Sequence, residues 1–149
     1  GEIVPPAPVF TGGSNFVAVY GPSNGYDPGW CTWHAANRRI ESGNPLPRNL
    51  GNANTWSARA SGVGITVLDA PVVGAVIWHD QSVTGSVAGG LGHVAYVEAV
   101  NADGSIIVSD MNSRGQANFD LSGGPAGGWG RVSYRQVTPD QFYKYDFIH

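Results

Sequence analysis

Glycine and proline divide this chain of 149 residues into short segments, and no other feature limits its fold as much. The sequence has 22 glycines and 10 prolines, and both residue types interrupt helices and strands. The apolar runs between them are short and rich in Val and Ile, which favours short strands joined by tight turns. The run from Trp30 to Glu41 lacks both residues and predicts the clearest helix.

The residues on either side of this run indicate where the helix begins and ends. Asp27 is a suitable N-cap, and Pro28 suits the first helical position that follows it. Gly43 can end the helix in a left-handed conformation. With these boundaries, Cys31 lies in the first turn of the helix.

The remaining chain predicts a single domain in which helices come first and strands follow. Residues 1–15 are interpreted as a linker or an N-terminal arm, and residues 16–149 as the folded domain. A second, short helix is expected at residues 54–60. Strands are expected near residues 64–68, 74–79, 92–100, 105–112, 130–136 and 143–148. This order favours an α+β fold, with N-terminal helices packed on a curled antiparallel sheet of about six strands.

Charge and cysteine content exclude several kinds of partner and site. The net charge is −3, and the Lys and Arg residues are dispersed apart from Arg38 and Arg39, unlike the basic patch of a nucleic-acid-binding protein. No apolar run approaches the ~18 residues that a membrane span needs. We therefore expect neither nucleic acid nor a membrane as a partner. One cysteine cannot form an intramolecular disulfide or a four-cysteine metal site.

Cys31 is this single cysteine, and a lone cysteine has two common interpretations. It is either a small buried hydrophobic residue or a reactive thiol. A helix N-terminus stabilises an anion through its unpaired N–H groups and its dipole, so a first-turn position is one way to activate a thiol. The same N–H groups can stabilise an oxyanion. The position of Cys31 is therefore compatible with a nucleophile.

A nucleophilic cysteine needs a base, and the chain offers four histidines. His34 lies on the same helix as Cys31, where we expect it on the helix surface without a firm orienting partner. His79 ends an apolar strand and His149 ends the chain, so we interpret both as structural or solvated. His93 opens a predicted strand directly after a glycine-rich loop, and it is our candidate for the base.

The strand that begins at His93 is expected to form a hairpin with the strand that follows the turn at residues 101–104. Alternation places one set of side chains on a common face: His93, Ala95, Val97, Ala99, Ile106, Val108, Asp110 and Asn112. Facing and diagonal pairs lie within roughly 5–8 Å of each other, so Asp110 or Asn112 could orient His93. Glu98 is expected on the opposite face, and we exclude it for this reason.

Two sequence blocks resemble a known family. Gly29–Trp33 and Gly92–Glu98 resemble the signature blocks of CHAP domains, which are cysteine, histidine-dependent amidohydrolases/peptidases. Further segments resemble the family in the same order along the chain: GNA with Trp56 at residues 51–56, PVVGAVI at 71–77, DGSI at 103–106, SDMN at 109–112 and FIH at 147–149. The resemblance covers about residues 20–149.

The resemblance implies a papain-like α+β fold and a catalytic domain that hydrolyses peptidoglycan. Family members act as N-acetylmuramoyl-L-alanine amidases or as endopeptidases. By motif, Cys31 is the nucleophile and His93 the general base. Asp110 stands where the family usually has Glu, and Asn112 falls on the family's Asn. Trp30 stands where many members have Gln, which leaves the backbone N–H of Cys31 to stabilise the oxyanion.

The resemblance also bears on metals, substrate and location. Some members bind calcium through an acidic loop before the cysteine. Only Asp27 closely precedes Cys31 here, so we expect no metal, and no cofactor of another kind. The substrate would be the stem or cross-bridge peptides of peptidoglycan, held between the helix tip and the hairpin, with Trp30 and Trp129 as contacts. We expect a monomer that is secreted or associated with the cell wall, or a phage-derived lysin.

Two alternatives to wall hydrolysis remain open from the sequence. The same fold could carry a thiol acyltransferase or an amidase that acts on a small conjugate. A module that binds the wall without catalysing a reaction is the other alternative. The residues of the sequence do not indicate which wall bond would be cut.

Overall fold

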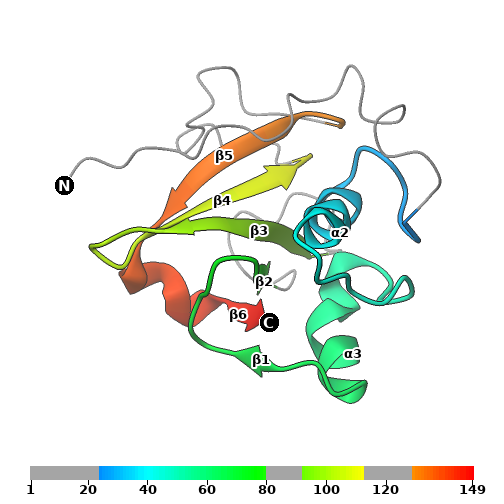
Figure 1. Ribbon diagram of the computed structural model, residues 1–149, viewed down its shortest axis with the longest axis horizontal. Helices are drawn as coiled ribbons and strands as arrows, with labels where there is room; N and C mark the ends of the chain where they lie inside the picture. Colours follow the sequence, from blue (N-terminus) through cyan, green and yellow to red (C-terminus); the bar gives the residue numbers. More distant parts are fainter. Residues whose placement is uncertain (1–23, 80–91, 113–128) are drawn as a thin grey trace.

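A six-stranded antiparallel sheet forms the centre of the computed structural model, which describes residues 24–79, 92–112 and 129–149. The strand order is β1-β6-β2-β3-β4-β5. The strands are β1 (Val67–Leu68), β2 (Val76–His79), β3 (His93–Val100), β4 (Ile106–Met111), β5 (Val132–Val137) and β6 (Asp146–Ile148). In Figure 1 they fan out from β5 to β1, with α2 and α3 gathered at one side. The predicted α+β fold with helices on an antiparallel sheet of about six strands is confirmed, and the sheet is not closed.

Two α-helices and two 3₁₀ helices accompany the sheet among the described residues. They are α2 (Cys31–Glu41), η2 (Ala53–Thr55), α3 (Trp56–Gly62) and η4 (Pro139–Lys144). The short helix expected at residues 54–60 is divided between η2 and α3. The strand expected at residues 143–148 starts only at β6, because η4 occupies the residues before it. No helix in the described ranges is long and apolar enough to cross a membrane.

The first turn of α2 differs from the prediction. Its N-cap is Trp30, in an extended conformation and without a side-chain cap, so Asp27 and Pro28 lie outside the helix. The predicted start was wrong because Gly29 adopts a φ of +93°, which is incompatible with a helical turn. The helix therefore begins at Cys31, and this residue is the first of its first turn, as expected.

The end of α2 follows the prediction. Gly43 has a φ of +80°, and its N–H donates to Ile40 O at 3.0 Å. The next N–H, of Asn44, donates to Arg39 O at 2.9 Å. This pair of bonds is a Schellman motif, which satisfies carbonyl groups that the end of a helix leaves open.

The two faces of the sheet bury different hydrophobic clusters. On one face α2 packs against β3 and β4, and α3 packs against β1 and β6. Trp33 and Ala36 of α2 belong to this cluster together with Ile107 and Met111. The opposite face buries a second cluster: Ala75, Ile77, Ala95, Val97, Ile106, Val108 and Phe147. His93 belongs to the second face, because it lines a small cavity together with residues of that cluster.

A β-bulge interrupts the pairing of β3 with β4. Val97 lies opposite Val108, but the next pair is Ala99 with Ile107, so the register shifts at Glu98. Ala99 consequently packs with the helix-side cluster, and our expectation that it shares the face of His93 was wrong. An extra residue in one strand reverses the alternation beyond it.

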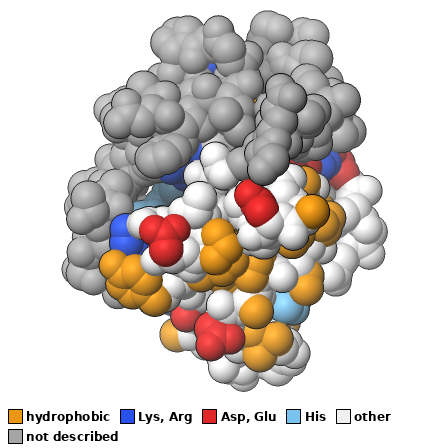
Figure 2. All heavy atoms as spheres, turned by 90° about the vertical axis from the view of Figure 1, so that its left-hand side faces the viewer, with side chains coloured by type: hydrophobic (Ala, Val, Ile, Leu, Met, Phe, Trp, Pro, Cys, Tyr) orange, Lys and Arg blue, Asp and Glu red, His pale blue; other side chains and the backbone are white. Residues whose placement is uncertain are grey.

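The end of the molecule opposite the helices has a mixed surface. Figure 2 shows hydrophobic side chains scattered among acidic ones over the described part of this face. Several large hydrophobic side chains are exposed away from α2 and away from Cys31. They include Leu68, Val72, Val73, Val100 and Tyr143. Scattered exposed hydrophobic residues are normal on a protein surface and do not by themselves indicate a binding site.

Candidate active site

Cys31 combines a helix N-terminus with an open cleft. It is the first residue of α2, its thiol is free, and its exposed fraction is 5%. It lines a cleft of about 570 Å³ that opens to solvent, a volume typical of ligand sites. The first N–H groups of a helix have no partner within the helix. Cys31 therefore has both an anion-stabilising end of α2 and a space for a ligand beside it.

His93 and Asp110 form a buried pair at the start of β3. Nε2 of His93 lies 2.9 Å from Oδ2 of Asp110, and the two residues are 1% and 0% exposed. An ionised carboxylate can only accept hydrogen bonds, so Nε2 carries the proton of this bond. In the neutral ring Nδ1 is then left without a proton. The proximity expected from the hairpin is confirmed, and Nδ1 is the nitrogen available to Cys31.

The ring of His93 is electrostatically coupled to Cys31. Burial lowers the pKa of His93, but the charge of Cys31 and hydrogen bonding to Asp110 and Cys31 outweigh burial and raise this pKa to about 9. Nδ1 has no well-formed hydrogen bond among the described residues. Catalytic hydrogen bonds are often long in unliganded proteins and shorten when substrate binds. The arrangement suits proton exchange between the thiol and the ring.

Arg135 is a member of this cluster that the sequence did not reveal. Its Nη2 pairs with Oδ2 of Asp110, the oxygen that also accepts from His93. Burial raises the pKa of Asp110, but the charge of Arg135 and the hydrogen bond from His93 lower it to about 2. In the register Arg135 lies opposite Val108, diagonal to Asp110. The sequence could have revealed this contact only if the pairing of β4 with β5 had been known, because that pairing places Arg135 near Asp110.

Asn112 lies next to this cluster without joining it. It directly follows β4, is 6% exposed and has a φ of +59°. Its Oδ1 is buried, and no hydrogen bond links it to His93 within the described residues. Of the two candidates for orienting His93, the structure brings Asp110 into contact and leaves Asn112 beside it.

The two tryptophans predicted to contact substrate occupy different places. Trp30 is 41% exposed and lines the cleft with Cys31. Trp129 is 55% exposed and lies against Gly29, where an added Cβ would meet its indole ring at 2.1 Å. The N–H of Gly130 donates to Gly29 O at 3.0 Å. Trp129 thus packs on the turn that leads into Cys31.

Two of the other histidines lie at the positions expected from the sequence, and the third does not. His79 pairs with His93 across β2 and β3, with ring centroids 5.7 Å apart. His149 has its Nε2 2.9 Å from Ala70 O. His34, expected on a helix surface without an orienting partner, is fully buried. That expectation was wrong because α2 lies across the sheet and turns position 34 toward β4.

The comparisons with known proteins show the family and the fold of the chain. The family model described as CHAP domain matches residues 21–112, a stretch that contains Cys31, His93 and Asp110. The chain belongs to the CHAP family. A solved structure with a similar fold is the N-acetylmuramoyl-L-alanine amidase from Staphylococcus aureus, with a TM-score of 0.70 and 30% identity over 84% of this chain and 31% of that one.

Curated relatives include a staphylococcal amidase and a probable staphylococcal autolysin. The N-acetylmuramoyl-L-alanine amidase sle1 of Staphylococcus epidermidis is 37% identical over 92% of this chain. The probable autolysin SsaALP of Staphylococcus aureus is 36% identical over 93% of this chain. The chain covers 36% of the first relative and 45% of the second, so it spans less than half the length of either.

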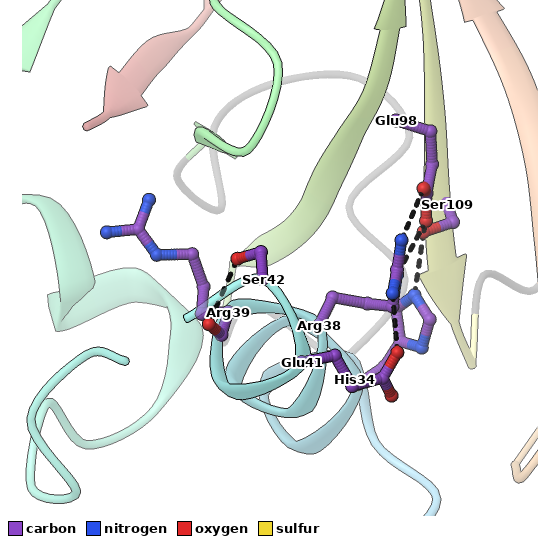
Figure 3. A network of polar contacts seen from close by, with 7 residues as sticks. All are labelled: His34, Arg38, Arg39, Glu41, Ser42, Glu98 and Ser109. Carbon is purple, nitrogen blue, oxygen red and sulfur yellow. Dashed lines mark hydrogen bonds and ion pairs between the residues drawn. The ribbon is translucent and has the colours of Figure 1, made fainter. Parts of the chain in front are cut away.

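A second buried polar network of this CHAP domain joins α2 to the hairpin, and Figure 3 shows it from close by. The hydroxyl of Ser109 donates to Glu98 Oε1 at 2.7 Å. That hydroxyl therefore accepts from His34 Nε2, 2.8 Å away. Arg38 of α2 donates to both carboxylate oxygens of Glu98, from Nε at 2.8 Å and from Nη2 at 2.7 Å. Glu98 thus faces α2 and not His93, as the sequence predicted.

This network connects the elements that carry the candidate catalytic residues. His34 lies one helical turn from Cys31 on α2, Glu98 is on β3 with His93, and Ser109 precedes Asp110 on β4. Burial lowers the pKa of His34 to about 4, so its ring is neutral near pH 7. The helix that carries Cys31 is therefore fastened to both strands of the hairpin by buried and partly buried hydrogen bonds.

Proposed function

We propose that this CHAP domain hydrolyses amide bonds of peptidoglycan by a thiol mechanism. In it Cys31 is the nucleophile, His93 the general acid and base, and Asp110 the residue that orients His93. The observation that supports the proposal most strongly is the order of the groups. Nε2 of His93 bonds a carboxylate, the charge of Cys31 raises the pKa of the same ring, and Cys31 lines an open cleft.

The first half of the reaction would form a thioester. Nδ1 of His93 takes the proton of the Cys31 thiol, and the thiolate attacks the carbonyl carbon of the substrate amide. The oxygen then carries a negative charge, which the backbone N–H of Cys31 at the start of α2 stabilises. When the C–N bond breaks, His93 returns the proton to the leaving amine.

The second half would release the acid and restore the enzyme. A water molecule gives a proton to Nδ1 of His93 and attacks the thioester carbonyl. The C–S bond breaks, the carboxylic acid leaves, and Cys31 recovers its proton. Asp110 remains ionised throughout, because Arg135 and His93 both stabilise its charge, and it holds the His93 ring in one tautomer.

The names of the relatives favour one bond as the first to test. Two relatives with a similar chain are called N-acetylmuramoyl-L-alanine amidases, which points to the amide between the muramoyl group and L-alanine. Cleavage within a stem or cross-bridge peptide is the second possibility. Relatives of this kind also suggest action at the cell wall, either as a secreted or as a wall-associated protein, and the domain would act there as a monomer.

The test is digestion of purified peptidoglycan followed by mass spectrometry of the products. An amidase releases intact stem peptides with a new N-terminal alanine. An endopeptidase cuts within the peptide and releases fragments whose new amino groups belong to residues from the interior of that peptide. Cys31→Ala should reduce the rate by several orders of magnitude. A Cys31→Ala protein that digests walls at the original rate would refute the thiol mechanism.

The same experiment separates the alternatives to hydrolysis. An acyltransferase would form a new amide when an amine acceptor is added and would release little free acid. A binding module would leave the wall undigested with or without Cys31. Asp140→Asn, a change at a fully exposed acid in η4, serves as the control variant and should digest walls at the original rate.

A further inference from the structure

The cleft beside Cys31 carries positive charge that the proposed chemistry does not use. Its described lining includes Arg48 and Arg59 and one acidic side chain, Asp27. The chain as a whole has a net charge of −3, so this local excess of positive charge runs against the overall balance. A cleft of this kind favours ligands with negative charge.

Arg59 differs from three arginines that are tied into the fold. Arg38 and Arg135 each form ion pairs with carboxylates, and Arg39 donates to three backbone carbonyl groups. The guanidinium of Arg59 has one hydrogen bond, from Nη1 to Asn49 O at 3.3 Å. It pairs with no carboxylate of the described residues, and its side chain is exposed. Most of its five N–H donors are therefore available to a ligand.

The loop against which Arg59 lies is held in place by side chains. Gly51 has a φ of +82°, and a Cβ there would meet Nη1 of Arg59 at 2.8 Å. Trp56 Nε1 donates to Gly51 O at 2.9 Å, and Thr55 Oγ1 donates to Leu50 O at 2.6 Å. A glycine at this point lets the guanidinium lie close to the loop. The wall of the cleft is thus fixed before a ligand arrives, which lowers the entropic cost of binding.

The charge of Arg59 acts on Tyr26, another residue that lines the cleft. Its ring lines the cleft, and its hydroxyl donates to Pro47 O at 2.7 Å and accepts from Leu50 N at 3.1 Å. Burial raises the pKa of Tyr26, and the charge of Arg59 opposes that rise. The guanidinium is therefore close to the wall that Tyr26 forms.

We infer that Arg59 forms a carboxylate-binding subsite of the Cys31 cleft, and that the substrate is a peptide with a free carboxylate near the amide that is cut. A guanidinium group matches a carboxylate in a planar, two-bonded geometry. The inference rests on the proposed function for the identity of the peptide. It adds a preference for charge that neither the family nor the chemistry of Cys31 requires.

The test compares two synthetic wall peptides that differ at one position, glutamate in the first and glutamine in the second. Binding is measured by calorimetry to the Cys31→Ala protein, which leaves the peptides uncut. We expect the glutamate peptide to bind about tenfold more tightly. This is the difference in affinity expected from one charge-assisted hydrogen bond at a solvent-accessible site. Arg59→Gln in the same background should remove this difference, and added salt should reduce it.

Two further variants make the result specific. Arg59→Lys keeps the charge without the planar group and should retain part of the preference. Lys144→Gln removes one positive charge in η4, away from the cleft, and should retain all of it. Equal binding of the two peptides, binding of neither, or a preference that survives Arg59→Gln would overturn the inference.

Failure of this inference can be told apart from failure of the proposed function. Wall digestion is measured separately with the protein that retains Cys31. Digestion without a charge preference would refute only the subsite at Arg59. A charge preference without digestion would refute only the hydrolysis, and would leave the cleft as a binding site for acidic peptides.

Discussion

Nε2 of His93 lies 2.9 Å from Oδ2 of Asp110, and both side chains are buried. The two residues come from neighbouring strands, at the end of the sheet where α2 begins. The carboxylate fixes which nitrogen of the ring carries a proton, and this leaves the other nitrogen for the thiol of Cys31.

Asp110→Asn should reduce kcat strongly with a smaller effect on KM. The amide can present an N–H to Nε2 and so favour the wrong tautomer of His93, and removing the carboxylate also leaves Arg135 without its counter-charge. A loss of ~10²–10⁴-fold in kcat is expected from the cost of a wrong tautomer in triads. The measurement is the initial rate of wall digestion with a thermal melt of the same protein. Asp103→Asn, in the exposed turn of the same hairpin, should digest at the original rate.

Cys31→Ala should lower the pKa of His93. The charge of Cys31 is the largest of the interactions that raise this pKa to about 9, so its removal leaves burial opposed mainly by Asp110. The measurement is an NMR titration of the His93 ring in both proteins. An unchanged pKa would show that the thiol and the ring do not interact.

The raised pKa of His93 also predicts how the stability of the fold changes at alkaline pH. The folded pKa of His93 lies above the ~6.5 of an unfolded chain, so this interaction stabilises the fold fully below that pH and is lost as pH rises through about 9. The free energy of unfolding should therefore fall between these two values. Urea unfolding should show a weaker fall in Cys31→Ala.

His34 predicts a loss of stability in mild acid. Burial lowers its folded pKa to about 4, so between pH ~6.5 and about 4 the unfolded chain binds a proton that the folded protein does not. The free energy of unfolding should fall by roughly 3 kcal/mol over this interval. In His34→Gln, whose amide can still donate to Ser109, the dependence should be flatter. An equally steep loss in that variant would assign the effect to another group.

Ser109→Ala should destabilise the protein more than an ordinary serine substitution. It removes the hydroxyl between His34 and Glu98 and leaves a buried donor and acceptor without that partner. The expected cost is about 1–3 kcal/mol in the free energy of unfolding. Ser61→Ala, at an exposed position of α3, should change stability by less than ~0.5 kcal/mol. Equal costs for the two variants would show that the network contributes no stability.

Gly29→Ala and Gly43→Ala should have different consequences although both glycines have positive φ values. Gly43 has open space around it, whereas a Cβ on Gly29 would meet the Trp129 ring at 2.1 Å. Gly43→Ala should cost about 1–2 kcal/mol through backbone strain alone. Gly29→Ala should cost more, change the tryptophan fluorescence and slow digestion, because it displaces the turn before Cys31. If the two variants have the same stability and the same digestion rate, the packing of Trp129 on Gly29 contributes to neither.

Local patterns were sufficient for several elements. A breaker-free run predicted α2, Gly43 predicted its end, and alternation around a short turn predicted that His93 and Asp110 lie together. These features depend on residues close in sequence, and their geometry follows from the periods of helix and strand. The start of α2 could not be predicted in this way, because Gly29 has a positive φ and lies against Trp129, 100 residues further along the chain.

The family, the order of helices and strands, and the candidates Cys31 and His93 can all be inferred from the amino-acid sequence. Which partners these residues have depends on how the helices and strands pack. Arg135 reaches Asp110 because β5 pairs with β4, His34 is buried because α2 crosses the sheet, and Arg59 lines the cleft next to the loop at Gly51. Contacts between distant segments depend on how elements pack, which no local period encodes.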